Sequence, residues 1–169
     1  EHLGRDQGED VVDGPLVSVV MTAFKATELI DVAINSILNQ TYRNIELIVV
    51  DDASPDDTFE HIKKLAEADS RIRPIQLEKN GGTYVAKNHG LLEAAGEYVT
   101  FHDSDDWCHP DKLKIQVQKL EQNTLLNGVT TGYIRVDEHS NIIYRGKGAI
   151  RHACISLMFR RKEILFLLL

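Results

Sequence analysis

The sequence predicts an α/β fold built on a mostly parallel sheet. Short apolar, β-branched runs at residues 16–22, 45–50, 72–77 and 98–101 alternate with segments whose apolar residues recur at helical spacing. Strands joined by helical crossovers lie parallel, and helices cover both faces of their sheet. The ligand crevice of such a sheet lies beyond the carboxyl ends of its strands. We therefore expect a Rossmann-like three-layer sandwich with its functional site at that edge.

Helices are predicted between these strands. An apolar repeat at helical spacing predicts the first helix over residues 29–38. Ser54 and Pro55 predict the start of a second helix, with Ser54 as its N-cap and Pro55 in its first turn. The core-facing residues of that helix are expected to be Phe59, Ile62, Leu65 and Ala66. A third helix is expected over residues 83–95, after a glycine-containing loop at residues 79–82.

The strict alternation of predicted strands and helices ends after Pro110. A helix carrying Leu113, Val117 and Leu120 is expected there, followed by strands at residues 129–136 and 142–144 joined by a polar turn. Residues 146–148 read as a loop, residues 154–159 as a strand and residues 160–163 as the start of a helix.

The two ends of the chain differ from its middle. Residues 1–14 lack apolar periodicity and are interpreted as a leader or linker, so the domain is expected to occupy residues 15–169. Residues 164–169 are all apolar, with no polar face or cap, which suggests a domain truncated at its C-terminal end.

Composition excludes several classes of function. The chain has 19 Lys and Arg against 26 Asp and Glu, a net charge of −7, which disfavours binding to a nucleic-acid backbone. No apolar stretch is long enough for a transmembrane helix. The polar, acidic N-terminal residues do not resemble a signal peptide. We therefore expect a cytoplasmic protein with no nucleic-acid partner and no transmembrane segment.

Three predicted strands end in polar residues. These are residues 22–24, 51–54 and 103–106, which the topology brings to one crevice. Neighbouring carboxylates repel one another unless a cation neutralises them, so Asp103 and Asp105 predict a divalent metal. Their hard oxygen ligands favour Mg²⁺ or Mn²⁺. For Asp57 and Asp106, the alternative interpretation is helix capping.

Other candidate residues also have a functional and a structural interpretation. Asp51 or Asp52 is expected to accept hydrogen bonds from a ligand, or else to form a turn. Phe24 offers a face for a nucleobase, or else packs in the core. The amides of Gly81 and Gly82 favour phosphate at a helix N-terminus, with Lys87 one turn inside that helix or else a solvated surface charge.

The residue spacings in this sequence do not match other known metal-binding or nucleotide-binding motifs. The sixth and twelfth positions of a calcium loop starting at Asp103 would be Cys108 and Lys114, where Gly and Glu are required. Zinc ligands are available by type, but their spacing does not match a zinc site. They are His102, Cys108, His109, His152 and Cys154. The sequence also lacks the GxGxxG and P-loop motifs.

Seven motifs, taken in order and spacing, closely resemble those of family 2 glycosyltransferases. They lie at residues 17–24, 36–42, 46–54, 80–82, 86–90, 96–98 and 103–107, and the resemblance covers roughly residues 15–163. It implies the A-type glycosyltransferase fold, an α/β sandwich that binds a nucleotide sugar. It also implies that Thr22, Ala23 and Phe24 line the nucleoside pocket and that Asp52 binds the base. The family often has Tyr at the Phe24 position.

The resemblance further implies a diphosphate and metal site. Gly82 and Lys87 would approach the nucleotide and its diphosphate, although the family more often has Arg at the Lys87 position. Asp103, Ser104 and Asp105 match the family's DxD motif. Asp105 would ligate Mn²⁺ or Mg²⁺, and Asp103 would contact the ribose or the metal and its waters. The metal would act as a Lewis acid on the departing diphosphate.

The implied reaction is an inverting transfer from a nucleoside-diphosphate sugar to an acceptor hydroxyl, of the hexosyl or N-acetylhexosaminyl type. UDP is the expected nucleotide, and the acceptor would be a saccharide or a lipid-linked molecule in bacterial polysaccharide or glycoconjugate synthesis. Peripheral association with the inner face of the membrane is compatible with such acceptors. The family's general base lies C-terminal to the strand at residues 154–159, so it is expected beyond Leu169. Donor binding with poor turnover is therefore expected.

Three alternatives remain at this stage. In a haloacid-dehalogenase-like phosphatase, Asp103 would be the nucleophile and Asp105 the acid, but that motif normally follows the first strand. A two-component receiver would need a separate phosphorylated Asp and a Lys at later strand ends. A nucleotide-sugar-binding module without turnover is the third alternative, because the region of the general base is absent.

Overall fold

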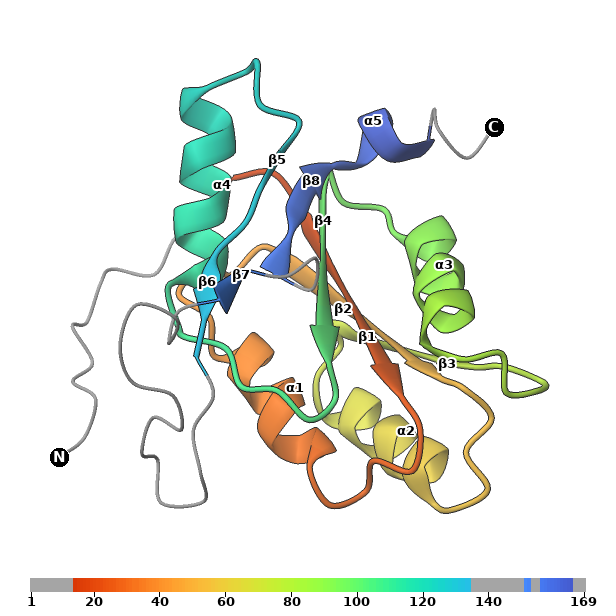
Figure 1. The fold of residues 1–169 in the computed structure, drawn as a ribbon. Helices are drawn as coiled ribbons and strands as arrows, with labels where there is room; N and C mark the ends of the chain where they lie inside the picture. The colour runs from red at the N-terminus through yellow and green to blue at the C-terminus, as the bar shows by residue number, and fades with distance from the viewer. Residues whose placement is uncertain (1–13, 135–150, 153–155, 166–169) are drawn as a thin grey trace, which may run out of the picture.

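The computed structural model describes residues 14–134, 151–152 and 156–165. A sheet of six strands forms its centre, in the order β3-β2-β1-β4-β8-β5 (Figure 1). The strands of this sheet are β1 (Val17–Ala23), β2 (Ile45–Asp51), β3 (Ile72–Gln76), β4 (Tyr98–Asp103), β5 (Gly128–Val129) and β8 (Met158–Arg160). Strands β1 to β4 are mutually parallel, whereas β8 runs antiparallel to both β4 and β5. The prediction of a mostly parallel α/β sheet is confirmed.

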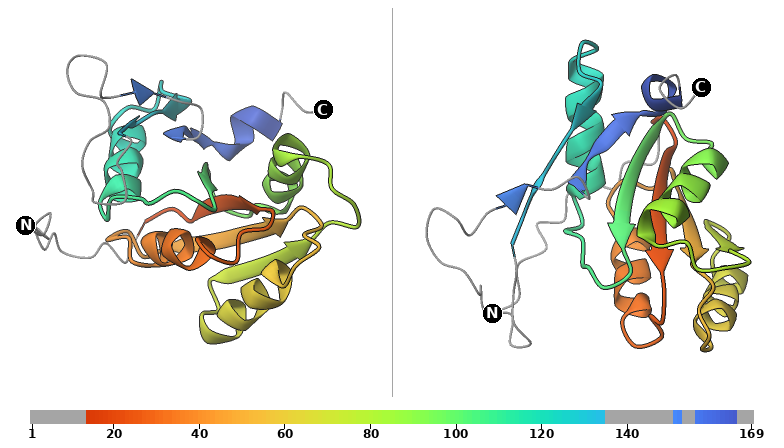
Figure 2. Two further views of the ribbon diagram at one scale, coloured as in Figure 1. Left: turned by 60° about the horizontal axis from the view of Figure 1, so that its bottom comes forward. Right: turned by 45° about the vertical axis from the view of Figure 1, so that its right-hand side comes forward.

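Helices cover both faces of the sheet. The helices are α1 (Ile30–Leu38), α2 (Thr58–Ala68), α3 (Thr83–Glu93), α4 (Lys112–Gln122) and the short α5 (Arg161–Leu165). Apolar residues of α1, α2 and α4 form one core cluster with the sheet, and those of α3 form a second cluster on the opposite face. Figure 2 shows these layers from two further directions. Every residue of β1 is buried, because this central strand has helices on both sides.

The predicted start of α2 is wrong. Helix α2 begins at Thr58 rather than beside Ser54, and the Ser54 hydroxyl instead accepts a hydrogen bond from the Lys25 amide at 3.0 Å. At the helix start, Asp56 accepts bonds from the Thr58 amide and hydroxyl. Asp57 stands at the N-cap position without a side-chain capping bond, so the capping interpretation fails for it.

The strand predicted at residues 129–136 is also interrupted. Its first part belongs to β5 in the main sheet, whereas β6 (Gly132–Tyr133) pairs with β7 (Arg151–His152) in a separate two-stranded sheet. Strand β8 occupies only the end of the strand predicted at residues 154–159. The expected hairpin and loop over residues 137–148 lie outside the described residues.

The C-terminal strand is joined to the fold through Arg160. Its buried guanidinium donates hydrogen bonds to the Tyr98 hydroxyl at 2.9 Å, the Leu120 carbonyl at 2.7 Å and the Leu126 carbonyl at 3.1 Å. Burial, together with the hydrogen bond to Glu121, raises the pKa of Tyr98 to about 12. This network connects β8 to β4 and to the end of α4. Within the described part of the chain, no helix is both long and apolar enough to cross a membrane.

Candidate donor and metal site

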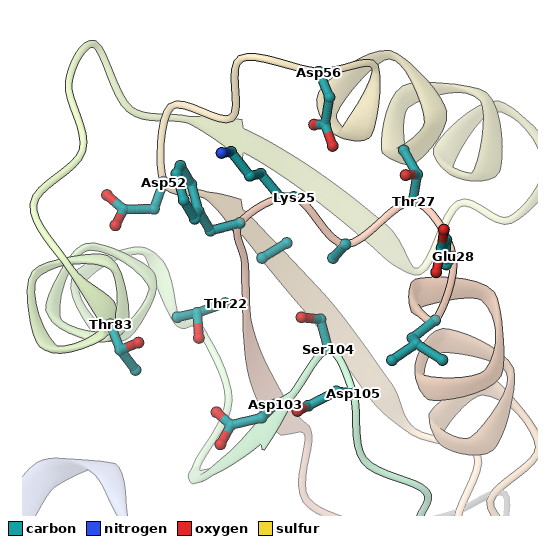
Figure 3. A pocket seen from close by; sticks show the side chains of 14 residues that line it. Thr22, Lys25, Thr27, Glu28, Asp52, Asp56, Thr83, Asp103, Ser104 and Asp105 are labelled. Atoms are coloured by element: carbon teal, nitrogen blue, oxygen red, sulfur yellow. The ribbon is translucent and has the colours of Figure 1, made fainter. Parts of the chain in front are cut away.

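The carboxyl ends of three parallel strands meet at one edge of the sheet. Thr22 in β1 is in register with Asp103 in β4, and Ala23 is in register with Asp51 in β2. Strand β4 continues two residues beyond its predicted end, so Asp103 is its last residue. A cavity of about 720 Å³ lies at this edge (Figure 3). The sequence-predicted residues that line it are Thr22, Ala23, Phe24, Asp52, Asp103, Ser104 and Asp105.

Three carboxylates gather at the β4 end of the cavity. Ligand oxygens of Asp103, Asp105 and Asp106 lie within 4.8 Å of one another. The buried Oδ1 atom of Asp103 is ion-paired with Lys87 Nζ at 2.9 Å and accepts no hydrogen bond from the described residues. Carboxylate oxygens are the donors that Mg²⁺ and Mn²⁺ prefer, so the residues present fit such an ion.

Lys87 is not a solvated surface charge. Its side chain is 16% exposed, and its ammonium lies 5.8 Å from the centre of the Phe101 ring as well as beside Asp103. Helix α3 places it on the face of β4 that carries Phe101 and Asp103. Although Lys87 does not line the cavity, its contact with Asp103 puts a positive charge at the carboxylate cluster.

Asp52 closes the opposite end of the cavity and also holds the start of α3. Its two carboxylate oxygens accept hydrogen bonds from the Gly81 amide at 2.8 Å and the Gly82 amide at 2.7 Å. Gly82 has a φ of +83°, a conformation that glycine adopts without strain. The predicted phosphate-binding amides of Gly81 and Gly82 are therefore bound to Asp52 in this structure. Of the acidic pair, Asp52 lines the cavity, whereas Asp51 is fully buried and accepts a bond from the Ser54 amide.

The loop between β1 and α1 forms the third wall. It is joined to the β2–α2 loop through hydrogen bonds from the Lys25 amide to Ser54 and from the Ala26 amide to Thr58. Lys25 and Ala53, on the two facing loops, have φ values of 52° and 54°, which are unfavourable for these residue types. Phe24 is 46% exposed, so its predicted alternative of core packing is wrong.

Sequence reasoning missed other residues of the cavity wall. They are Lys25, Ala26, Thr27, Glu28, Leu29, Asp56 and Thr83. No motif marks them, but all except Asp56 and Thr83 directly follow the first strand, where the crevice rule places ligand contacts. Figure 3 shows that Thr27, Glu28 and Asp56 lie on the side of the cavity away from Asp52.

A buried imidazole supports the carboxylate cluster from within the fold. His102 is 4% exposed, and its Nε2 atom lies 3.2 Å from the Asp106 carbonyl oxygen. Desolvation, with a smaller contribution from the positive charge of Lys112, lowers the pKa of His102 to about 3. A neutral imidazole can donate its Nε2 proton to this carbonyl. The sequence offered His102 as a zinc ligand by type only, and its ring contacts a backbone carbonyl.

Among the described residues, the remaining zinc candidates do not form a cluster of three ligands. Cys108 is a buried free thiol whose pKa is raised by desolvation. This agrees with its alternative interpretation as a small apolar residue. The N-cap of α4 is Asp111 rather than Asp106, so Asp106 does not cap that helix. The side chains of His152 and Cys154 are outside the described residues.

Comparison with known proteins identifies the family that this chain resembles. Residues 18–166 match the family described as Glycosyl transferase family 2. An uncharacterised glycosyltransferase of Haemophilus influenzae is 41% identical over 112 residues, which are 66% of this chain and 45% of that protein. The putative teichuronic acid biosynthesis glycosyltransferase TuaG of Bacillus subtilis is 40% identical, over 65% of this chain and 44% of its own length.

Solved structures agree on the fold. The mannosyltransferase PcManGT of Pyrobaculum calidifontis, solved with GDP-Man and Mn²⁺, is similar with a TM-score of 0.72 and 24% identity, over 95% of this chain and 48% of that one. S. aureus TarS, solved with UDP-GlcNAc, gives a TM-score of 0.73 and 22% identity, over 89% and 46% of the two chains. The chain thus spans less than half the length of these relatives and has the GT-A fold. Since the family match covers most of the sequence, the chain belongs to glycosyl transferase family 2.

Proposed function

We propose that this chain binds the donor in a metal-dependent, inverting transfer of a sugar from a nucleoside-diphosphate sugar to an acceptor hydroxyl. In that reaction the acceptor oxygen bonds to the anomeric carbon, the bond from that carbon to the diphosphate breaks, and a base takes the hydroxyl proton. The observation that carries the proposal is the placement of Phe24, Asp52 and Asp105 around one cavity at the carboxyl ends of β1, β2 and β4. No residue of this chain is assigned as the base.

The nucleoside is proposed to lie at the β1 and β2 ends of the cavity. Phe24 presents an exposed ring there, and stacking of a base on an aromatic ring contributes about 1–3 kcal/mol. Thr22 and Ala23 line the same cavity. Asp52 keeps lone pairs free of its bonds to Gly81 and Gly82, and these can accept a hydrogen bond from the base.

The diphosphate is proposed to lie near the carboxylate cluster. Asp105 and Asp103 would hold Mn²⁺ or Mg²⁺, which supplies Lewis-acid stabilisation of the leaving diphosphate when bound. Ser104 lines the same wall, and Gly82 lies where α3 begins. Lys87 places its ammonium beside Asp103 and so adds positive charge near the diphosphate.

UDP is the proposed nucleotide, and the transferred sugar is of the hexosyl or N-acetylhexosaminyl type. A UDP-GlcNAc complex of TarS and a GDP-mannose complex of PcManGT illustrate both donor types on this fold. The name of TuaG, which refers to teichuronic acid biosynthesis, supports bacterial polysaccharide or glycoconjugate synthesis. We propose a saccharide or lipid-linked acceptor, which peripheral attachment to the cytoplasmic face of a membrane would bring close to the site.

Calorimetric titration of UDP, GDP and dTDP, with Mn²⁺ and with EDTA, tests this proposal. We expect one nucleotide to bind with micromolar affinity in Mn²⁺, and Asp105→Ala to weaken that binding at least tenfold. Asp57→Ala is the matched control, because it removes the same charge from an exposed residue outside the cavity that makes no capping bond. Failure of all three nucleotides to bind, with Mn²⁺ or with EDTA, would contradict the proposal.

Metal-dependent hydrolysis of the corresponding sugar donor separates an enzyme from a binding module. Slow release of free sugar that requires Asp105 would support the transferase assignment. Nucleotide binding without any hydrolysis or transfer would instead favour a donor-binding module in this chain.

A further inference from the structure

The loop that carries the metal-binding carboxylates has few bonds of its own. It runs from the end of β4 at Asp103 to the start of α4 at Lys112. Backbone bonds join the Asp106 amide to the Asp103 carbonyl and the Lys112 amide to the His109 carbonyl. Asp105 and Asp106 are exposed. Apart from these bonds and the contact of His102 with the Asp106 carbonyl, the position of the carboxylates depends on residues that hold the loop from outside.

Gln40 supplies a large part of that support. This residue follows α1, is fully buried and does not line the cavity. Its Nε2 atom donates a hydrogen bond to the His109 carbonyl at 2.8 Å and lies 3.3 Å from the Cys108 sulfur. Its Oε1 atom accepts a bond from the Leu113 amide at 3.0 Å, in the first turn of α4. One side chain thus joins the end of the loop to the start of the following helix.

Neighbours of Gln40 add further contacts with the same segment. The Ser36 hydroxyl accepts a hydrogen bond from the Cys108 amide at 3.2 Å. The amide of Thr41 donates to the Pro110 carbonyl at 2.9 Å, and its hydroxyl donates to Asp111 at 2.8 Å. The C-terminal end of α1 therefore fixes residues 108–113, while β4 fixes the other end of the loop.

We propose that Gln40 is a positioning residue for the metal-binding loop, so that it sets the affinity for Mn²⁺ or Mg²⁺ without touching the ion. This inference deepens the proposed function and rests on it. The role requires an amide, because one side chain must donate to His109 and accept from Leu113. Glutamate keeps the acceptor and loses the donor, and methionine keeps the approximate shape and loses both. The contacts proposed between the nucleoside and Phe24 or Asp52 lie at the other end of the cavity and do not involve Gln40.

The test is a titration of Mn²⁺ in the presence of UDP, followed by electron paramagnetic resonance of the free ion. Trp107, the single tryptophan of the chain, lies in this loop and gives a second signal through quenching of its fluorescence. We expect Gln40→Met to weaken Mn²⁺ binding about tenfold and Ser36→Ala to weaken it two- to threefold. Gln40→Glu should weaken it at least as much as Gln40→Met, because it buries a carboxylate oxygen against the Ser36 and His109 carbonyls. UDP affinity in EDTA should change less than twofold in all three variants.

Asn39→Ala is the matched control. Its amide donates to the Asn35 carbonyl within α1 and has no hydrogen bond to the metal-binding loop, so its Mn²⁺ affinity should equal that of the wild type. A folded Gln40→Met protein with unchanged Mn²⁺ affinity would overturn the inference. If that variant does not fold, Ser36→Ala decides, and unchanged affinity there would overturn it. A wild-type chain that binds no Mn²⁺ would instead refute the proposed metal site, and this inference with it.

Discussion

The two ends of the donor cavity are held in different ways. At the nucleoside end, Asp52 both lines the cavity and binds the amides of Gly81 and Gly82. At the metal end, Gln40 holds the loop from outside the cavity, while Asp105 faces the proposed ion. Anchoring and the proposed ligand contact are thus united in one side chain at the first end and divided between two at the second. Stability and binding should therefore be separable by mutation only at the metal end.

Asp52→Ala should have the largest effect, because it removes the anchor and the ligand contact together. Hydrogen bonds to charged groups contribute about 1.5–3 kcal/mol each, and Asp52 accepts two, so we expect a loss of about 3–6 kcal/mol in the free energy of unfolding. UDP affinity in EDTA should fall at least tenfold. Urea denaturation and calorimetry measure the two effects. Asp52→Asn, which retains one acceptor oxygen, should be intermediate, and loss of UDP binding at unchanged stability would refute the double role.

Lys87→Met tests the connection between the two ends, since α3 begins beside Asp52 and places Lys87 against Asp103. The Lys87 ammonium competes with Mn²⁺ for Asp103 Oδ1, and the substitution removes that competitor. We expect affinity for Mn²⁺ alone to rise about threefold, in line with Coulomb energies in a partly solvated site. Paramagnetic resonance of free Mn²⁺ measures it. Lys63→Met, at an exposed pair with Glu60, should have no effect, and weaker Mn²⁺ binding in Lys87→Met would mean that Lys87 holds Asp103 in place.

Gly82→Ala tests the backbone conformation at the start of α3. A Cβ atom at this position would meet no atom within 4 Å, so the cost comes only from the backbone conformation at a φ of +83°. That cost is about 1–3 kcal/mol in the free energy of unfolding, because a φ of +83° with a ψ of 164° is a conformation that residues other than glycine rarely adopt. Urea denaturation measures it. Gly82→Asn should lose about as much, because ψ is 164° and this backbone conformation lies outside the left-handed region that asparagine tolerates; an unchanged stability in both variants would show that the conformation does not require glycine.

Hydrophobic patterning was enough to predict the layers of the fold. The buried runs that became β1 to β4 contain β-branched residues that pack on both faces of a parallel sheet, and their predicted limits differ from the structure by one or two residues. The start of α2 was misplaced because the Ser54 hydroxyl bonds to Lys25, which lies 29 residues away in sequence. Local capping preference could not reveal that tertiary contact. The separation of β5 from β6 likewise depends on their pairing with β8 and β7.

Cavity residues were predicted where a strand ends in a polar motif. Cavity residues in loops that carry no motif were missed. Thr22, Asp52 and Asp105 follow from the rule that ligands bind at the carboxyl ends of parallel strands, whereas Thr27 and Asp56 lie in loops whose path the sequence does not specify. The anchoring roles depend on still longer distances. Gln40 is 69 residues from His109, so its part in the metal loop is visible only once α1 and α4 are packed together.

The contacts of Arg160 have a consequence for the order in which the protein folds. This residue donates hydrogen bonds to the hydroxyl of Tyr98, which precedes it by 62 residues, to the Leu120 carbonyl in α4 and to the Leu126 carbonyl in the segment after α4. Strands β1 to β4 and their connecting helices instead depend on contacts between segments that leave the ribosome earlier. Strands β1 and β2 pair across 28 residues (Val17 with Ile45), whereas β4 and β8 pair across 62 (Tyr98 with Arg160). Because closing a longer loop has a higher entropic cost, we expect β1 and β2 to acquire structure before β8 joins β4. Pulsed hydrogen exchange on refolding chains should therefore protect β1 amides ahead of those in β8.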